Sequence, residues 1–260
     1  MKLLTRSELL ARDPSEFVVR PHALPSVFSQ HVLFMDKPQA WSSFDVIRKL
    51  RPLLQFKKIG HAGTLDPMAT GLLICLTGRA TKLMERFMNL AKTYEGTLRL
   101  GQTTASYDAD TPVESDVPWS HLDNEDLEAA RHKFIGSITQ ETPIYSAVKI
   151  GGERLYKKAR RNEAITPPKR HVEVYQFDLL ARDGADVSFR VQCSKGTYIR
   201  SIAHEFGAAL GVGAHLTSLR RTHIGAFSVA DAWTMQTLTE AIRQRDEDTT
   251  DEQNGEAKDA

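Results

Sequence analysis

One short stretch of the sequence combines an acid with residues that restrict its backbone. Asp66 precedes Pro67 within a Gly-, Pro- and Thr-rich segment that runs from Gly60 to Gly71. Pro67 disfavours helical backbone at Asp66, while Gly63 and Gly71 allow a positive φ or a close backbone approach. A carboxylate held in such a turn can act as a nucleophile, or it can simply bind nearby backbone amides. From composition alone, the structural role is the commoner one.

The sequence motifs of several large enzyme classes are missing. The chain contains no GxGxxG, GxxxxGK[ST], GxSxG or HExxH, so nucleotide-binding, serine hydrolase and zinc protease functions lack support. The two cysteines, Cys75 and Cys193, lie far apart in apolar contexts. We expect both in the core, with no disulfide framework and no metal site.

Length and charge narrow the class of protein. The 260 residues are enough for one or two domains. No apolar run approaches the roughly 18 residues that span a bilayer, and the N-terminus lacks a secretory signal, so we expect a soluble, cytoplasmic protein that binds no membrane. Residues 245–260 hold seven acids and two bases, which leaves 32 bases against 26 acids elsewhere. This acidic tail is predicted to be disordered, and a solubilising role is commoner for such a tail than specific binding.

A second concentration of charge lies at residues 149–171, with eight Lys or Arg and two Glu. Such a stretch is a candidate contact for a polyanion.

The hydrophobic pattern predicts the elements that must position Asp66. Apolar runs and alternation predict strands, whereas three- and four-residue spacing predicts helices. Either Ser42 or Ser43 can cap the first long helix. Together the elements favour an α+β fold with a large mixed, mainly antiparallel sheet flanked by helices. The expected strands cover residues 31–35, 72–76, 93–100, 172–180 and 187–193, the last two joined by a turn at Asp183-Gly184, and the expected helices cover 80–90, 124–134 and 198–210, the last ending at Gly211.

Five segments, in order, resemble the TruB family of tRNA pseudouridine synthases, in which GTLDPxATGLL surrounds the catalytic aspartate. They are MDKPQAWSSFDVIRKL at 35–50, GHAGTLDPMATGLLICLTGRATKL at 60–83, KTYEGTLRLGQTTASYDADTP at 92–112, ETPIYSAVKIGGERLYKKARR at 141–161 and GTYIRSIAHEFGAALGVGAHLTSLRRTHIGAFS at 196–228. The resemblance covers roughly three quarters of the chain. It implies a pseudouridine-synthase fold, conversion of uridine 55 in the T-loop of tRNA to pseudouridine, the tRNA T-arm as partner, and no cofactor or metal.

The resemblance also implies roles for individual residues. Asp66 corresponds to the catalytic aspartate, and Arg200 to an arginine that pairs with this carboxylate. Tyr94 corresponds to a tyrosine that stacks on the flipped base and is placed to move a proton, and Tyr198 to an aromatic that lines the pocket. Without the family, Tyr94 would be taken for a core tyrosine and Arg200 equally well for a solvent-facing charge.

Three further residues correspond to family positions that contact the substrate. His61 matches a histidine near the extruded nucleotide, Lys82 a supporting lysine near the active site, and Leu219 a leucine against the base. Their alternatives are a neutral histidine bound to the loop backbone, a solvated lysine and a core leucine.

The chemistry of the expected reaction leaves its intermediate open. The N-glycosidic bond must break, the base must turn, and its C5 must bond to the same ribose. A carboxylate can attack C6 of the base, attack C1′ of the ribose, or help to form a glycal. The nucleotide must first flip out of its stack, which costs a few kcal/mol.

The insertion at about 141–171 is expected to close over the T-arm. Its side chains should bind phosphates, so affinity should fall steeply with salt. The residues assigned to the RNA backbone are Lys157, Lys158, Arg160 and Arg161.

The expected organisation is an N-terminal extension over residues 1–30, a catalytic domain over 31–229, a short C-terminal remnant over 230–244 and the acidic tail over 245–260. The residues after Val229 are too few for the RNA-binding PUA domain of many bacterial members. We expect a monomer. Two alternative functions stay open, a tRNA-folding chaperone of the same fold and a synthase that acts on another RNA.

Overall fold

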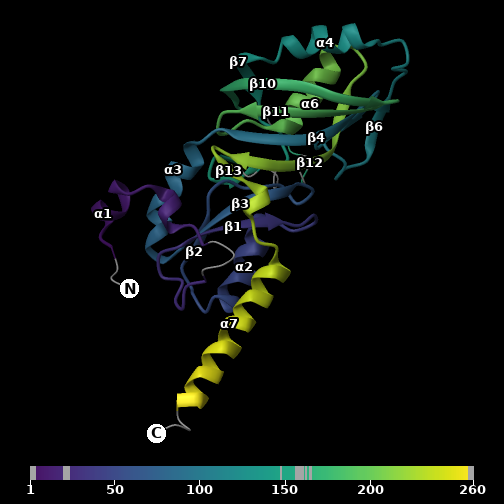
Figure 1. The fold of residues 1–260 in the computed structure, drawn as a ribbon. Coiled ribbons are helices and arrows are strands. Elements are labelled where there is room, and N and C mark those ends of the chain that lie inside the picture. The colour runs from purple at the N-terminus through teal and green to yellow at the C-terminus, as the bar shows by residue number, and fades with distance from the viewer. Residues whose placement is uncertain are drawn as a thin grey trace. The chain divides into compact units, whose positions relative to one another are not determined.

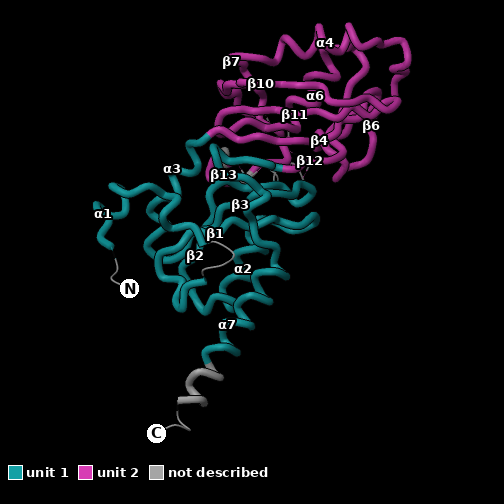
Figure 2. Tube along the Cα trace, viewed as in Figure 1, with its two compact units in different colours: residues 1–90, 221–260 teal, residues 91–220 magenta. Residues whose placement is uncertain are grey.

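The computed structural model describes residues 4–19, 24–146, 148–155, 161, 163 and 166–256. The chain divides into two compact units (Figure 2), unit 1 with Met1–Leu90 and Arg221–Ala260, and unit 2 with Ala91–Arg220. The catalytic domain expected over residues 31–229 therefore contributes to both units. The expected insertion at 141–171 belongs to unit 2.

Two long strands of unit 1 are buried on both faces. Strand β3 (Thr70–Thr77) pairs antiparallel with β1 (Val32–Lys37) and with β2 (Ile59–His61). Because alternate side chains of a strand point to opposite faces, Leu33 and Met35 join one apolar cluster, whereas Val32 and Phe34 join the other. Burial on both sides explains why these strands read as continuous apolar runs in the sequence.

Helices cover the two faces of these strands. On one face lie α2 (Ser43–Leu53) and α7 (Met235–Glu256), which contribute Val46, Ile47 and Leu238 to the cluster (Figure 1). The other face is covered by α1 (Arg6–Ala11), the 3₁₀ helices η1 (Pro14–Phe17) and η2 (Gly78–Leu83), and α3 (Met84–Asn89).

Unit 2 is built on an antiparallel sheet. In sheet order, the strands after β12 (Ala214–Ile224) are β4 (Lys92–Leu100), β11 (Asp186–Cys193), β10 (Lys169–Asp183) and β7 (Gly136–Glu141). Helices α4 (Asn124–His132) and α6 (Ile199–Ala209) pack against it, and the ring of Phe206 lies 5.8 Å from that of Phe177. The chain passes from unit 2 to unit 1 within β12, whose end pairs with β13 (Phe227–Ser228).

Short elements complete the units. In unit 2, β5 (Gln102–Thr104) pairs with β6 (Val113–Asp116), and β8 (Lys149–Ile150) pairs with β9 (Glu153–Arg154). In unit 1, the 3₁₀ helix η3 (Val229–Asp231) precedes α7.

The α+β prediction is confirmed, as are the antiparallel hairpin of β10 and β11 and the end of α6, where Gly211 has a φ of 77°. The helix expected over residues 80–90 is instead η2 followed by α3. Here the Thr81 hydroxyl donates to the Gly78 carbonyl 2.8 Å away, which favours the tighter 3₁₀ turn.

The disorder expected for residues 245–260 does not hold for 245–256, which continue α7. Residues past the expected boundary make two side-chain contacts. Arg245 donates to the carbonyl of Pro25 at 2.7 Å, and the Thr249 hydroxyl donates to the Arg245 carbonyl at 2.8 Å. Residues 257–260 lie outside the described residues.

In the part of the chain that the structure describes, no helix combines the length and apolarity needed to span a membrane. Nor do its His, Cys, Asp and Glu side chains gather in groups of three or more that could hold a metal ion.

Gly207 of α6 leaves no room for a side chain. A Cβ there would lie 2.0 Å from the backbone nitrogen of Ala214 and 2.2 Å from the carbonyl carbon of Gly213. We expect Gly207→Ala to lower the free energy of unfolding by about 2 kcal/mol or more, because packed backbone must move. Denaturant unfolding measures the loss. The exposed neighbour supplies the control, since Ala208→Gly should cost only about 1 kcal/mol of helix propensity, and an equal or smaller loss for Gly207→Ala would contradict the expectation.

Candidate functional site

The loop that carries Asp66 joins β2 to β3 and has the backbone that its glycines predicted. We call residues 62–69 the Asp66 loop. Gly63 has a φ of 95° and Gly71, at the start of β3, a φ of 102°. A Cβ at Gly71 would lie 2.3 Å from the carbonyl oxygen of Arg221, so only glycine lets these two backbones meet.

Side chains from three other segments hold the backbone of this loop. The Ser43 hydroxyl accepts from the amide of Leu65 at 2.8 Å and lies 3.1 Å from the Leu65 carbonyl, to which it donates. Beyond Asp66, the carbonyl of Pro67 accepts from the amide of Ala40 at 2.9 Å and from Lys37 Nζ at 3.3 Å.

Arg221 ties the start of the loop to β3. Its Nε donates to the carbonyl of Leu72 at 2.7 Å, and its second guanidinium nitrogen donates to the carbonyl of Gly63 at 3.1 Å. The residue is 1% exposed, so the guanidinium is a buried cation that bridges two backbone segments.

Lys37 is a second buried cation beside the loop. Its Nζ also donates to the carbonyls of Pro38 at 3.0 Å and Trp41 at 2.6 Å. Burial lowers the pKa of Lys37 to about 8, against an opposing effect of the nearby Asp66 carboxylate. The pKa of His61 is also lowered, first by burial and then by the positive charge of Arg221. A lowered pKa favours the neutral imidazole at His61.

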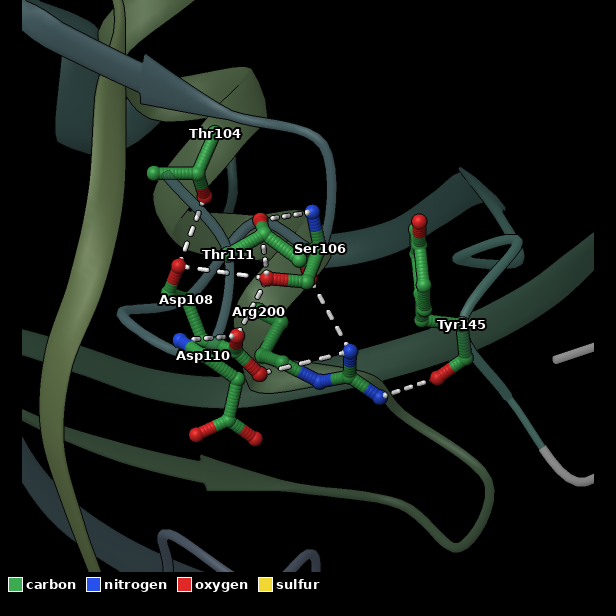
Figure 3. A network of polar contacts seen from close by, with 7 residues as sticks. All are labelled: Thr104, Ser106, Asp108, Asp110, Thr111, Tyr145 and Arg200. Carbon is green, nitrogen blue, oxygen red and sulfur yellow. Dashed lines mark hydrogen bonds and ion pairs between the residues drawn. The ribbon is translucent and has the colours of Figure 1, made fainter. Parts of the chain in front are cut away.

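In unit 2, Arg200 lies in a buried polar network (Figure 3). Its guanidinium forms an ion pair with Asp108 at 3.4 Å and donates to the carbonyls of Ser106 at 2.9 Å and Tyr145 at 3.0 Å. Asp108 accepts in turn from the hydroxyl of Ser106 and the amide of Asp110. The alternative of a solvent-facing helix charge is therefore wrong for Arg200, which is 4% exposed.

Tyr198 is held at the N-terminus of α6. The side-chain amide of Gln140 accepts from the Tyr198 N–H at 2.7 Å and donates to its carbonyl at 2.9 Å. The guanidinium of Arg170 lies 4.8 Å from the centre of the tyrosine ring, in a cation–π contact. The phenol ring is half-buried, so it combines a fixed backbone with an accessible aromatic surface.

The other predicted site residues lie on strands and on a 3₁₀ helix. Tyr94 on β4 shares the buried face of Leu98 and Leu100, and β12, which carries the buried Leu219, is the neighbouring strand of β4. Lys82 is an exposed residue of η2.

Of the residues assigned to the RNA backbone, Lys157, Lys158 and Arg160 lie outside the described residues. Arg161 forms ion pairs with Glu153 at 2.8 Å and Glu163 at 2.6 Å.

The residues that hold the predicted ones in place were not singled out from the sequence. Lys37 and Ser43 lie in the first resembling segment, but the loop residues that they bind, Pro67 and Leu65, lie outside it. A charged residue within a strand-like apolar pattern could have pointed to two of them. Lys37 ends an apolar run, and Arg221 lies in an alternating strand. Asp108 and Gln140 carried no such signal.

The chemistry available is a half-buried carboxylate on a rigid loop in unit 1, and in unit 2 a fixed buried guanidinium and an aromatic ring suited to stacking. A carboxylate of this kind can serve as a nucleophile.

Comparison with known proteins identifies similar families and relatives. Residues 51–199 match the model of the TruB family pseudouridylate synthase N-terminal domain, and residues 200–255 match that of the tRNA pseudouridylate synthase B C-terminal domain. The tRNA pseudouridine synthase B of Flavobacterium johnsoniae is 43% identical over 219 residues, which cover 82% of this chain and 96% of that protein. The protein of the same name from Opitutus terrae is 46% identical over 207 residues, which cover 80% of this chain and 86% of that protein.

Chains in two solved structures are also similar to this one. An archaeal box H/ACA sRNP Nop10-Cbf5 complex contains a chain that is 28% identical with a TM-score of 0.65, over 88% of this chain and 60% of that one. A Cbf5-Nop10-Gar1 complex gives 31% identity and a TM-score of 0.64, over 85% of this chain and 57% of that one. This chain thus spans less than two thirds of either of these two structural relatives.

The lowered pKa of Lys37 predicts a specific pH dependence of stability. The unfolded amine titrates near 10.4, so between about pH 8 and 10 the unfolded chain holds a proton that the folded chain has lost. This difference makes the free energy of unfolding rise with pH in that window. Below about pH 8 both states are charged and the contribution is constant.

We therefore expect the free energy of unfolding of the wild-type protein to rise between pH 8 and 10 relative to that of Lys37→Met, which has no amine to titrate. Denaturant titrations at four or five pH values measure the two slopes. The exposed Lys49→Met on α2 is the control and should keep the wild-type slope. Identical slopes for the wild type and Lys37→Met would show that the amine does not lose its proton in this window.

Proposed function

The chain belongs to the TruB family of pseudouridine synthases, RNA isomerases that act on tRNA, and from this premise we propose that it converts uridine 55 of the T-loop to pseudouridine. The observation that carries the proposal is the segment GTLDPMATGLL, in which the Asp66 loop is fixed by Ser43, Lys37 and Arg221. Asp66 thus lies on a loop whose backbone is fixed by several hydrogen bonds. Such a loop suits a reaction that depends on precise placement of a carboxylate.

The reaction is balanced within one nucleotide. The bond from N1 to C1′ breaks and a bond from C5 to C1′ forms, while C5 loses a proton and N1 gains one. We propose that Asp66 is the carboxylate that starts this exchange, by attack on C6, by attack on C1′ or through a glycal. No net oxidation or reduction occurs, so the chemistry needs only positioning, charge and proton transfer.

The remaining roles follow the family positions. Arg200 is proposed as a catalytic cation and Tyr94 as the tyrosine that stacks on the base and moves a proton. The cation–π contact of Tyr198 with Arg170 supports a role in lining the base pocket, because it orients the ring. The residues proposed as further substrate contacts are His61, Lys82 and Leu219.

The proposal includes the setting in which the enzyme works. We infer a cytoplasmic enzyme that acts as a monomer on the T-arm of tRNA. Size-exclusion chromatography with light scattering tests the monomer.

The first test is replacement of the proposed catalytic carboxylate. Pseudouridine mapping on an unmodified tRNA transcript, by chemical adduct formation and primer extension, should give a stop at position 55 with the wild-type protein and none with Asp66→Asn. The loss should be complete because the amide is no longer a nucleophile. Asp183→Asn, at the exposed end of β10, is the control and should keep the stop.

Other outcomes of this mapping separate the alternatives. A stop with both the wild type and Asp66→Asn would contradict the assignment of Asp66. Binding of the transcript without a stop at any position would favour a tRNA-folding chaperone. A stop on another RNA but not on the tRNA would favour a synthase with a different substrate.

The basic stretch gives a second, independent test. We expect charge reversal at Lys157, Lys158, Arg160 and Arg161 to weaken tRNA binding by more than about tenfold, because cations near the RNA backbone supply the salt-dependent part of affinity. Filter binding across a salt series should show a shallower slope, by about one unit for each phosphate that the variant no longer binds. Circular dichroism should stay unchanged, and unchanged affinity in a folded variant would contradict the assignment.

A further inference from the structure

Ser43 makes a pair of contacts with the residue that precedes Asp66. It is the first residue of α2 and is 2% exposed. Its hydroxyl accepts from the Leu65 amide at 2.8 Å and donates to the Leu65 carbonyl at 3.1 Å. One side chain therefore satisfies both backbone groups of Leu65.

We propose that Ser43 is a positioning residue for the reaction, which acts by fixing the peptide group that joins Leu65 to Asp66. This inference rests on the proposed role of Asp66. The Leu65 carbonyl belongs to that peptide group, so its hydrogen bond to Ser43 restricts rotation of the backbone directly before the carboxylate.

The backbone after Asp66 is tied as well. The Asp66 carbonyl accepts from the amide of Ala69 at 3.1 Å, and the Pro67 carbonyl accepts from Ala40 and Lys37. With both flanking peptide groups fixed, the backbone from which the Asp66 side chain extends is held in place. Of these ties, the one made by the Ser43 hydroxyl acts on the peptide group before Asp66, so removal of this hydroxyl releases that group.

The helix does not need this hydroxyl. Ser42 is the N-cap of α2, and its side chain accepts from the amide of Asp45 at 3.1 Å, while Asp45 accepts from the amide of Ser42 at 2.9 Å. The capping box is therefore complete without Ser43. A small side chain that both donates and accepts is required only by Leu65, since Ala would leave two buried backbone groups unpaired.

The same unit contains a matched control. Thr77 is fully buried at the end of β3 opposite the Asp66 loop. Its hydroxyl accepts from the amide of His31 at 3.0 Å and donates to the His31 carbonyl at 3.2 Å. Thr77→Val thus removes a hydroxyl with the same pair of backbone contacts, at the end of β3 that is far from the Asp66 loop.

The experiment compares Ser43→Ala with Thr77→Val. Single-turnover rate constants for pseudouridine formation are measured with enzyme in excess on an unmodified tRNA transcript, beside Kd from filter binding and stability from denaturant unfolding. We expect Ser43→Ala to lower the rate constant by about tenfold or more with Kd within about threefold of wild type, because a misplaced catalytic group costs rate rather than binding. Thr77→Val should lose stability but keep a rate constant within about twofold of wild type.

Equal rate constants for the two variants, or a loss in Ser43→Ala that appears only in Kd, would overturn the positioning role. If Ser43→Ala does not fold, Ser43→Cys takes its place with the same expectation, since a thiol of similar size forms weaker hydrogen bonds. A wild-type protein inactive on the transcript would instead count against the proposed function, so the two failures are distinguishable.

Discussion

Backbone carbonyls that are buried around a tight loop must find donors inside the protein, and this constraint shapes the surroundings of Asp66. Regular secondary structure cannot supply those donors, because the loop leaves the strand ladder between β2 and β3. Arg221 supplies one for Gly63 of the loop while it also binds Leu72 in β3, and Lys37 supplies one for Pro67 beside the amide of Ala40. Two buried cations therefore hold the loop together with the hydroxyl of Ser43 and the amide of Ala40.

Buried backbone carbonyls in unit 2 also find their donor in a cation, but here the cation is paired with a carboxylate. Arg200 donates to the carbonyls of Ser106 and Tyr145, and Asp108 compensates its charge within the same network (Figure 3). Within this pair, the carboxylate of Asp108 also accepts from the hydroxyl of Ser106 and the amide of Asp110, which offsets part of the cost of burying its charge. Arginine also keeps its charge when it is buried, whereas burial lowers the pKa of Lys37. Unit 1 therefore holds buried carbonyls with Lys37 and Arg221, whereas unit 2 holds them with an arginine that is paired to an aspartate.

The sequence predicted the elements better than the contacts between them. Apolar runs located β1 and β3 because both strands are buried on both faces, and alternation located β4 because one face is half-buried. Local pattern failed at α7, where the helix continues into a stretch whose composition suggested disorder and Arg245 binds the distant carbonyl of Pro25. Residues such as Asp108 were not found, since their importance depends on a partner that is distant in sequence, here Arg200.

The two serines at the start of α2 show which contacts a local sequence pattern cannot predict. From sequence, either serine could cap the helix, because both precede the first apolar position at an acceptable spacing. The structure gives the cap to Ser42, which leaves the hydroxyl of Ser43 to bind Leu65, 22 residues further along the chain. The preference of serine for the N-cap position could identify a cap of the helix. It could not tell which of two adjacent serines caps the helix and which binds Leu65. The division depends on which side of the helix start faces the Asp66 loop, and only the packing of α2 against that loop determines it.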